Sequence, residues 1–268
     1  MSMLVDGVFA ECIPADDRGL LFGETVFETI AFWHQRVPLW ALHMNRLAHG
    51  ARLLGLDPPD PDLLREECRT LLDALSEDSG ILRITLTAGS GGQGYWPASS
   101  PRPRRIVQRR DWPGRLEQQR SRGLRTMISR HRLGPPGPMS GLKHGNRLLQ
   151  TLAARECAEA GLDEALLLGP GGEIAEAISS NLILVGEHSL MTPSGPEVAG
   201  VGLEWLRGEL GTELVDGSIS PAELESLREV LVINSVAGVR AVVSIDGTPF
   251  ERGPVFRRLL SLWQSKLF

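Results

Sequence analysis

The sequence predicts an α+β protein with a small N-terminal α/β domain and a larger, strand-rich C-terminal domain. Two kinds of apolar pattern support this prediction: segments that alternate with the period of a strand, and segments with apolar residues at helical spacing. A stretch dense in proline and arginine, residues 97–113, is the best candidate boundary between the halves. The expected division is residues 1–108 for the first domain, 109–122 for a linker region and 123–268 for the second.

The N-terminal half begins with extended segments. Residues 3–10 (MLVDGVFA) are typical of a strand and turn, and residues 16–19 (DDRG) of a loop. Residues 20–33 are rich in aromatic and β-branched residues, which predicts a strand or a strand–turn–strand. Two helices are expected next, over residues 39–56 and 63–75, because leucines recur there at helical spacing.

Residues 81–88 alternate cleanly and predict a strand with two different faces. Leu82, Ile84 and Leu86 fall on the face expected to meet the core, whereas Arg83 and Thr85 fall on a face polar enough to line a cleft. The glycine-rich GSGGQGY that follows lacks the pattern of a nucleotide phosphate loop. It is either a flexible hairpin end or a loop over an active site.

The C-terminal half mixes helical and strand-like segments. The expected helices cover residues 144–160, 203–210 and the stretch from Pro254 onward. The expected strands cover residues 164–168, 173–177, 181–185, 229–234 and 239–245.

The net charge of −5 is unevenly distributed. Residues 102–132 hold 11 arginines against Asp111 and Glu117, a local balance of +9. This basic segment is explained by solvated strand faces, by attraction of a small anionic substrate, or by nucleic-acid binding. No segment approaches the roughly 20 apolar residues of a membrane span, and the three cysteines lack metal-like spacing. A cytoplasmic protein without a metal site is expected.

Lys143 is singular in this chain. Apart from Lys266, near the C-terminal end, every other basic residue among the 28 lysines and arginines is an arginine. Arginine keeps its proton near neutral pH and does not form a Schiff base, so a lone internal lysine suggests selection for amine chemistry. The alternative is a codon bias that replaced lysine by arginine elsewhere.

Several short motifs occur in a characteristic order: DRGLLFGETVFETI, HMNRL, GSGGQGY, LKHGNRL, DEALLL and EAISSNL followed by MTP. Together they resemble the class IV aminotransferase family, whose members are fold-type IV enzymes that use pyridoxal 5′-phosphate. The ordered set extends over most of the chain. The resemblance implies a two-domain fold with a pseudo-barrel C-terminal domain, pyridoxal phosphate as the cofactor and a small-molecule substrate.

The resemblance assigns the residues that anchor and tune the cofactor. Lys143 corresponds to the lysine that forms the Schiff base with the cofactor and moves the substrate's Cα proton. The family pattern E-x-x-x-x-N falls on Glu176 and Asn181, and its glutamate faces the cofactor's ring nitrogen and keeps it protonated.

The cofactor's phosphate needs cations and N–H donors. By resemblance, Arg46 of HMNRL supplies the cation, and the backbone amides of Val201 and Gly202 supply donors at a helix N-terminus. Gly202 stands where the family has a hydroxyl residue, so only its amide can serve. Ser235 is expected to add a hydroxyl contact.

Two features resemble the lyases of this family, which convert 4-amino-4-deoxychorismate to 4-aminobenzoate and pyruvate. Residues 143–148 (KHGNRL) fit the lyase pattern K-x-x-N-R-L. Thr29 in F-E-T occupies the position from which a threonine assists protonation of the leaving pyruvyl unit. The resemblance thus implies that Lys143 and Thr29 are catalytic.

Two departures keep an alternative open. Ala88 and Gln93 stand where arginines are usual in the lyases, and Arg83 is expected to bind a substrate carboxylate in their place. The alternative is an aminotransferase acting on D-amino acids or branched-chain amino acids. In either case the resemblance implies a homodimer, and no nucleic-acid or membrane partner is expected.

Overall fold

The computed structural model of this chain describes residues 3–34, 36–75, 78–195 and 198–267. Over this described part, the chain separates into two compact units. The N-terminal unit comprises residues 1–112 and 142–146, and the C-terminal unit comprises residues 113–141 and 147–268. Each unit has its own sheet and its own buried core. The domain division of 1–108 and 123–268 stays a prediction.

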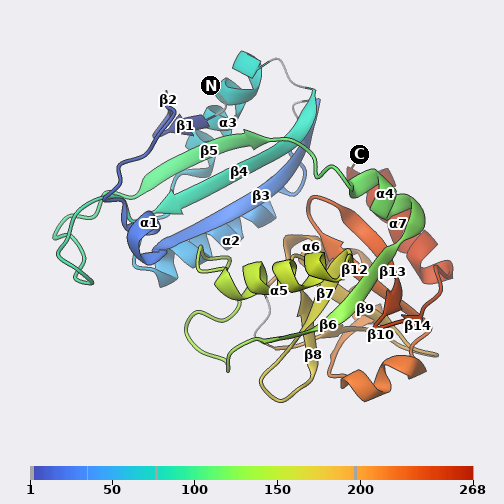
Figure 1. Cartoon of the computed structure of the whole chain (residues 1–268). Helices are drawn as coiled ribbons and strands as arrows, with labels where there is room; N and C mark the ends of the chain where they lie inside the picture. The colour runs from blue at the N-terminus through green and yellow to red at the C-terminus, as the bar shows by residue number, and fades with distance from the viewer. Residues whose placement is uncertain (1–2, 35, 76–77, 196–197, 268) are drawn as a thin grey trace. The chain divides into compact units, whose positions relative to one another are not determined.

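The N-terminal unit is built on a sheet whose described strands run in the order β2–β1–β5–β4–β3 (Figure 1). The strands are β1 (Met3–Val5), β2 (Val8–Phe9), β3 (Thr25–Trp33), β4 (Ser79–Thr87) and β5 (Arg104–Arg110). Neighbouring strands pair antiparallel. Asp6 and Gly7 join β1 to β2 with positive φ at both residues, the geometry that a two-residue hairpin requires.

Helices α2 (Trp40–Leu53) and α3 (Pro61–Leu75) contribute to the core of this unit. Leu82, Ile84 and Leu86 of β4 are buried in the same core, which confirms the predicted alternation. Arg83 and Thr85 belong to the opposite face of the strand, because side chains alternate along it. One face of the sheet is therefore apolar and covered, and the other is polar.

The predicted strand over residues 20–33 is wrong at its start, because residues 20–22 belong to helix α1 (Arg18–Phe22). The local reason is capping at both ends. The Asp17 carboxylate accepts the backbone N–H of Gly19 at 2.8 Å, and Gly23 closes the helix with a φ of 66°.

The predicted helix over residues 144–160 also begins later, as α5 (Leu148–Glu159). Residues 143–145 instead run along the edge strand β3. The Phe27 N–H donates to the Lys143 carbonyl at 3.0 Å, and the Gly145 N–H donates to the Thr25 carbonyl at 2.9 Å. Tertiary pairing with β3 thus overrides the helical pattern of the local sequence.

The described strands of the C-terminal unit form a second, larger sheet in the order β11–β10–β9–β12–β13–β6–β7–β8, with β14 paired to β13. The strands are β6 (Leu124–Arg132), β7 (Glu164–Leu168), β8 (Ile174–Ala177), β9 (Asn181–Val185), β10 (Leu190–Pro193), β11 (Leu214–Gly217), β12 (Glu229–Asn234), β13 (Gly238–Ile245) and β14 (Thr248–Pro249). Strand β8, at one end, also contacts β9 and β10 toward the other end, so the sheet curls. This curl agrees with the pseudo-barrel that the resemblance implies.

Helices cover this curled sheet. They are α4 (Leu116–Arg122), α5, α6 (Val201–Leu210) and α7 (Pro254–Leu267), with short 3-10 turns η1 (Gly211–Glu213) and η2 (Pro221–Ser226). Helix α5 packs on β6 and β7, α6 on β12, and α7 on β12 and β13. Helix α6 begins two residues before the predicted start at Leu203, which places Val201 and Gly202 in its first turn.

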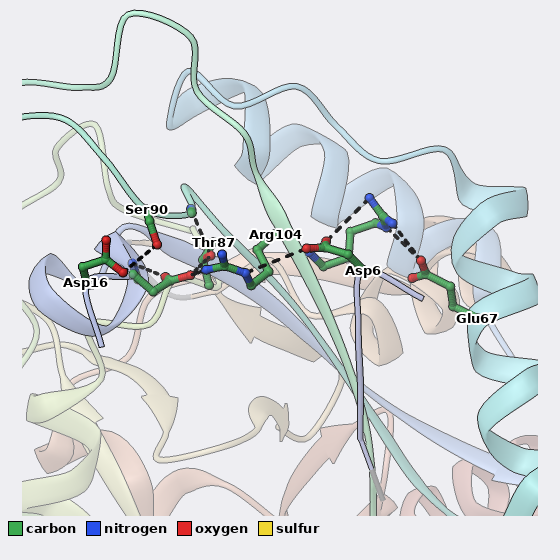
Figure 2. A network of polar contacts seen from close by, with 10 residues as sticks. Asp6, Asp16, Glu67, Thr87, Ser90 and Arg104 are labelled. Carbon is green, nitrogen blue, oxygen red and sulfur yellow. Dashed lines mark hydrogen bonds and ion pairs between the residues drawn. The ribbon is translucent and has the colours of Figure 1, made fainter. Parts of the chain in front are cut away.

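Many arginines of the basic segment 102–132 are neutralised by acidic side chains. Their ion pairs are Arg104–Asp17, Arg105–Glu67, Arg109–Asp111, Arg120–Glu117, Arg122–Asp163, Arg125–Asp163 and Arg130–Glu156. Figure 2 shows this network, with Asp16 and Ser90 at one end, Arg104 and Asp6 in the middle and Glu67 at the other end. These contacts favour a structural role for much of the segment.

The helices in the described part of the chain are all too short or too polar to cross a bilayer.

Candidate functional site

Lys143 is placed by the edge of the N-terminal sheet. Its neighbour His144 pairs with Val26 of β3 in an antiparallel bridge, so Lys143 lies opposite Phe27 and projects on the same face of the sheet. Its Nζ lies 4.7 Å from the centre of the Phe27 ring. The half-buried amine is therefore held on the polar face of the sheet, against an aromatic ring.

Arg83 occupies the same polar face. Its guanidinium carbon lies 3.7 Å from the centre of the Phe27 ring, and Arg83 pairs in register with Thr29 of β3. Burial and then the charge of Arg110 lower the pKa of Arg83 to about 10, so it stays cationic at neutral pH. Within the described residues, no hydrogen bond or ion pair engages Arg83. Lys143 and Arg83 thus contact one ring, and Thr29 lies on the same face of the sheet.

Arg46 lies on α2 and holds a buried glutamate of β3. Its Nε and Nη2 donate to the two Glu28 carboxylate oxygens at 2.7 and 2.5 Å. His43 Nδ1 lies 2.6 Å from the same carboxylate. Burial alone would raise the pKa of Glu28, but the charge and hydrogen bonds of Arg46, aided by His43, lower it to about 2. Glu28 is therefore an anion at every physiological pH.

Asn146 anchors the lysine segment to the turn that follows α1. Its Nδ2 donates to the Gly23 carbonyl at 3.3 Å. A Cβ at Gly23 would lie 2.0 Å from Asn146 Oδ1, so only glycine allows this approach. The contact explains why a glycine and an asparagine far apart in the sequence belong to two of the family-like motifs.

In the C-terminal unit, Glu176 and Asn181 hold the same residue. Val198 donates its backbone N–H to Glu176 Oε2 at 3.0 Å, and its carbonyl accepts from Asn181 Nδ2 at 2.9 Å. The Glu176 carboxylate also lies 3.5 Å from Gln150 Nε2, and both motif side chains are buried. The spacing E-x-x-x-x-N thus places the two side chains on either side of a turn, where they bind the N–H and the carbonyl of one residue, Val198.

The N-terminus of α6 is suited to an anion. Its N-cap is Gly200, so no side chain caps the helix, and in the described part of the chain no acceptor takes the N–H of Val201 or Gly202. A Cβ at Gly202 would lie 3.3 Å from the Asn234 carbonyl carbon and 3.5 Å from the Ser235 nitrogen. The backbone before Ser235 therefore lies directly against the first turn of α6. This donor-rich corner fits the phosphate of pyridoxal 5′-phosphate.

A buried network supports the turn that carries Ser235. Asn234 Oδ1 accepts the N–H groups of Val236 and Ala237 at 3.0 and 2.7 Å. Its Nδ2 donates to Ser180 Oγ at 3.0 Å, and buried Arg240 donates to the same oxygen at 3.0 Å. The turn is therefore fixed by side chains from β12, from β13 and from the turn between β8 and β9.

The structure groups the predicted residues by unit. In the N-terminal unit, Lys143, Thr29 and Arg83 share one sheet face, while Arg46 lies on the helix that covers the other. The predicted residues of the C-terminal unit are contiguous: Asn181, which binds Val198 together with Glu176, also lies against Gly200 at the start of α6, and the first turn of α6 lies against the backbone before Ser235.

Sequence reasoning missed Glu28 and His43. Both lie inside quoted motifs, F-E-T and HMNRL, so the signal was a polar residue at a motif position with no role assigned to it.

Comparisons with known proteins identify relatives. A model of the family "Amino-transferase class IV" matches residues 25–245. Aminodeoxychorismate lyase of Vibrio harveyi is 29% identical over 272 residues, which cover 95% of this chain and 97% of that protein. The branched-chain-amino-acid aminotransferase of Escherichia coli K12 is 26% identical over 258 residues, 90% of this chain and 84% of the relative.

A solved structure has the same fold as this chain over nearly its whole length. The crystal structure of 4-amino-4-deoxychorismate lyase from Pseudomonas aeruginosa matches with a TM-score of 0.90 and 34% identity, covering 99% of each chain. The predicted fold class is thereby confirmed.

Proposed function

This chain belongs to the class IV aminotransferase family of pyridoxal-phosphate enzymes, and from that premise we propose that it is an aminodeoxychorismate lyase. The reaction converts 4-amino-4-deoxychorismate to 4-aminobenzoate and pyruvate. The similarity to two lyases over nearly the full length of each chain supports this choice.

The observation that carries the proposal is the state of Arg83. It is a partly buried cation that makes no hydrogen bond or ion pair among the described residues, and it shares the Phe27 ring with Lys143. A desolvated guanidinium attracts a carboxylate strongly, because little solvent is left to displace. The proposed substrate carries two carboxylates, whereas the side chain of a branched-chain amino acid is apolar and would leave this cation unmatched.

The residues of the N-terminal unit perform the proton transfers in this proposal. Bound pyridoxal phosphate supplies an electron sink for the pair left at the substrate's Cα. Lys143 Nζ holds the cofactor between turnovers and, once released, takes the proton from that carbon. Thr29 Oγ1 delivers a proton to the departing pyruvyl unit. Arg83 orients the substrate by a carboxylate.

The remaining predicted residues are assigned to the cofactor. Glu176 holds the proton on the ring nitrogen, and Asn181 keeps Glu176 in register by bracketing Val198. In the proposal the phosphate is bound by the residues that the resemblance assigns to it: Arg46, the backbone amides of Val201 and Gly202, and the hydroxyl of Ser235.

The test is to give cofactor-loaded protein 4-amino-4-deoxychorismate with no 2-oxo acid and to follow both products. Equal, catalytic appearance of 4-aminobenzoate and pyruvate is the expected result. Arg83→Met should raise KM about 10- to 100-fold, the effect of losing a hydrogen bond to a charged group. Arg83→Lys, which keeps the charge, is the matched control and should lose less.

An aminotransferase is the second candidate. Ala88 and Gln93 stand where the lyases usually carry arginines, and the similarity to a branched-chain aminotransferase covers most of this chain. Turnover that requires both an amino donor and a 2-oxo acid acceptor, with no 4-aminobenzoate formed, would replace the lyase by this candidate.

The proposal includes a cytoplasmic homodimer, as in the sequence analysis. Light scattering of the purified holoenzyme should give twice the 29.2 kDa of one chain.

A further inference from the structure

Glu28 has no role in the scheme above, although it is a fully buried carboxylate that pairs with Arg46. Its side chain is 0% exposed. From β3 it contacts two side chains of α2, those of Arg46 and His43. Burial of a carboxylate is costly unless its charge is matched and hydrogen-bonded. Such a group in the interior of a strand therefore needs an explanation.

The contact geometry determines how Arg46 is presented. A guanidinium has five N–H donors in a rigid planar fork. Nε and one Nη2 donor point to Glu28, so the plane of the fork is set and its outer edge, which includes Nη1, is turned away from the carboxylate. A long arginine side chain otherwise loses rotamer entropy when a ligand immobilises it. Glu28 removes that freedom before any ligand binds.

The same helix face lies against the segment that carries Lys143. Gly50, one turn after Arg46, packs so closely that a Cβ there would lie 2.9 Å from Val26 and 3.9 Å from Leu142. The charge of Lys143 also contributes to lowering the pKa of His43, after the larger effect of burial. Arg46 and Lys143 thus both contribute to the electrostatic surroundings of His43 within one unit.

His43 supports a single negative charge on Glu28. Burial lowers its pKa, so the imidazole is neutral at physiological pH and its Nδ1–H donates to Glu28. Among the described residues its Nε2 has no partner. The cluster therefore consists of one anion, one cation and one neutral donor.

We propose that Glu28 is a positioning residue that acts through Arg46 to fix the site for the cofactor's phosphate. This inference rests on the proposed assignment of Arg46 to that phosphate. In this inference Glu28 touches neither the cofactor nor the substrate. Substitution of Glu28 should therefore weaken the binding of ligands that carry the phosphate and leave the binding of other ligands nearly unchanged.

The experiment measures the affinity of the apo-protein for pyridoxal 5′-phosphate and for pyridoxal, which lacks the phosphate. Glu28→Gln keeps the shape and removes the charge. It should weaken pyridoxal-phosphate binding about 10- to 100-fold, the range for a lost hydrogen bond to a charged group, and change pyridoxal binding less than about threefold. Arg46→Met should show the same selectivity, and the double variant should lose no more than Arg46→Met alone.

Glu67→Gln is the matched control. Glu67 is also a buried glutamate of the N-terminal unit, bound by both Nε and Nη2 of Arg105 at 3.0 and 2.9 Å (Figure 2). It lies on α3 and takes part in the Arg105–Asp6 network. Its loss should leave the affinities for both ligands unchanged.

Several outcomes would overturn the inference: equal weakening for both ligands, additive losses in the double variant, or unchanged pyridoxal-phosphate affinity in Glu28→Gln or Arg46→Met. If Glu28→Gln does not fold, Glu28→Asp replaces it. Aspartate keeps the charge but reaches one methylene less far, so a smaller loss, again confined to the phosphate-bearing ligand, is expected. No substrate is used, so failure of the lyase reaction and failure of this inference are separate results.

Discussion

In the N-terminal unit the candidate groups are cationic side chains held by other side chains, whereas in the C-terminal unit they are a carboxylate and amides held by the main chain. Lys143 and Arg83 lie against Phe27, and Arg46 is clamped by Glu28. Glu176 instead accepts the Val198 N–H, and the amides of α6 stand beside Ser235. Substitutions should therefore act through charge in the first unit and through backbone geometry in the second.

The largest effect is expected at Lys143, where charge alone is not sufficient. Lys143→Ala should reduce turnover by more than about 10³-fold, because a proton-transfer group and the cofactor's anchor are both lost. Lys143→Arg restores the charge but cannot supply a neutral amine, so it should be equally inactive in the product assay. Activity in Lys143→Arg would break the comparison, since the amine would then act only as a cation.

Glu176→Gln tests whether the C-terminal unit contributes a negative charge to catalysis in addition to its backbone N–H donors. The amide can still accept the Val198 N–H, so the protein should bind the cofactor with near-normal affinity. Turnover should fall about 10²-fold, because no anion stabilises the protonated ring nitrogen. The cofactor content and kcat of the purified variant decide this, and an unchanged kcat would contradict the assigned role.

The Glu28 cluster makes the stability of the N-terminal unit depend on acid. Its folded pKa of about 2 lies below the ordinary 4.5, so the stabilisation is complete above about pH 4.5 and is lost as the pH falls toward about 2. The shift corresponds to about 3 kcal/mol. Denaturant unfolding at a series of pH values should show a weaker acid dependence for Glu28→Gln than for the unsubstituted protein. Equal slopes would mean that the cluster is not coupled to folding.

Gly202→Ala should have the smallest effect. It tests whether backbone geometry in the C-terminal unit controls binding of the cofactor. A Cβ would lie 3.2 Å from Ile233 and 3.3 Å from the Asn234 carbonyl carbon, so the turn must shift by a few tenths of an ångström. The affinity for pyridoxal 5′-phosphate should fall about 2- to 5-fold, the scale of one helix-terminus interaction. Gly208→Ala, on the same helix with nothing within 4 Å of the new Cβ, is the control.

Much of the fold follows from local patterns. The two-face alternation of β4 and the leucine spacing of α2 and α3 depend only on the period of strand and helix, and both are present in the structure. The predicted element boundaries are wrong where tertiary contacts or helix caps determine the local structure. Residues 20–22 are of strand-like types, yet Asp17 and Gly23 cap this segment as part of a helix.

The sequence alone determined that the chain has one internal lysine, which motif surrounds it, and which residue types could serve a phosphate cofactor. These are one-dimensional facts, and the confirmed family agrees with them. Only the tertiary structure decided what each side chain touches. Antiparallel pairing with β3 places Lys143 and Arg83 against the same Phe27 ring, although 60 positions separate them. The pairing of Glu28 with Arg46 likewise depends on how α2 packs on β3, a long-range contact that no local pattern encodes.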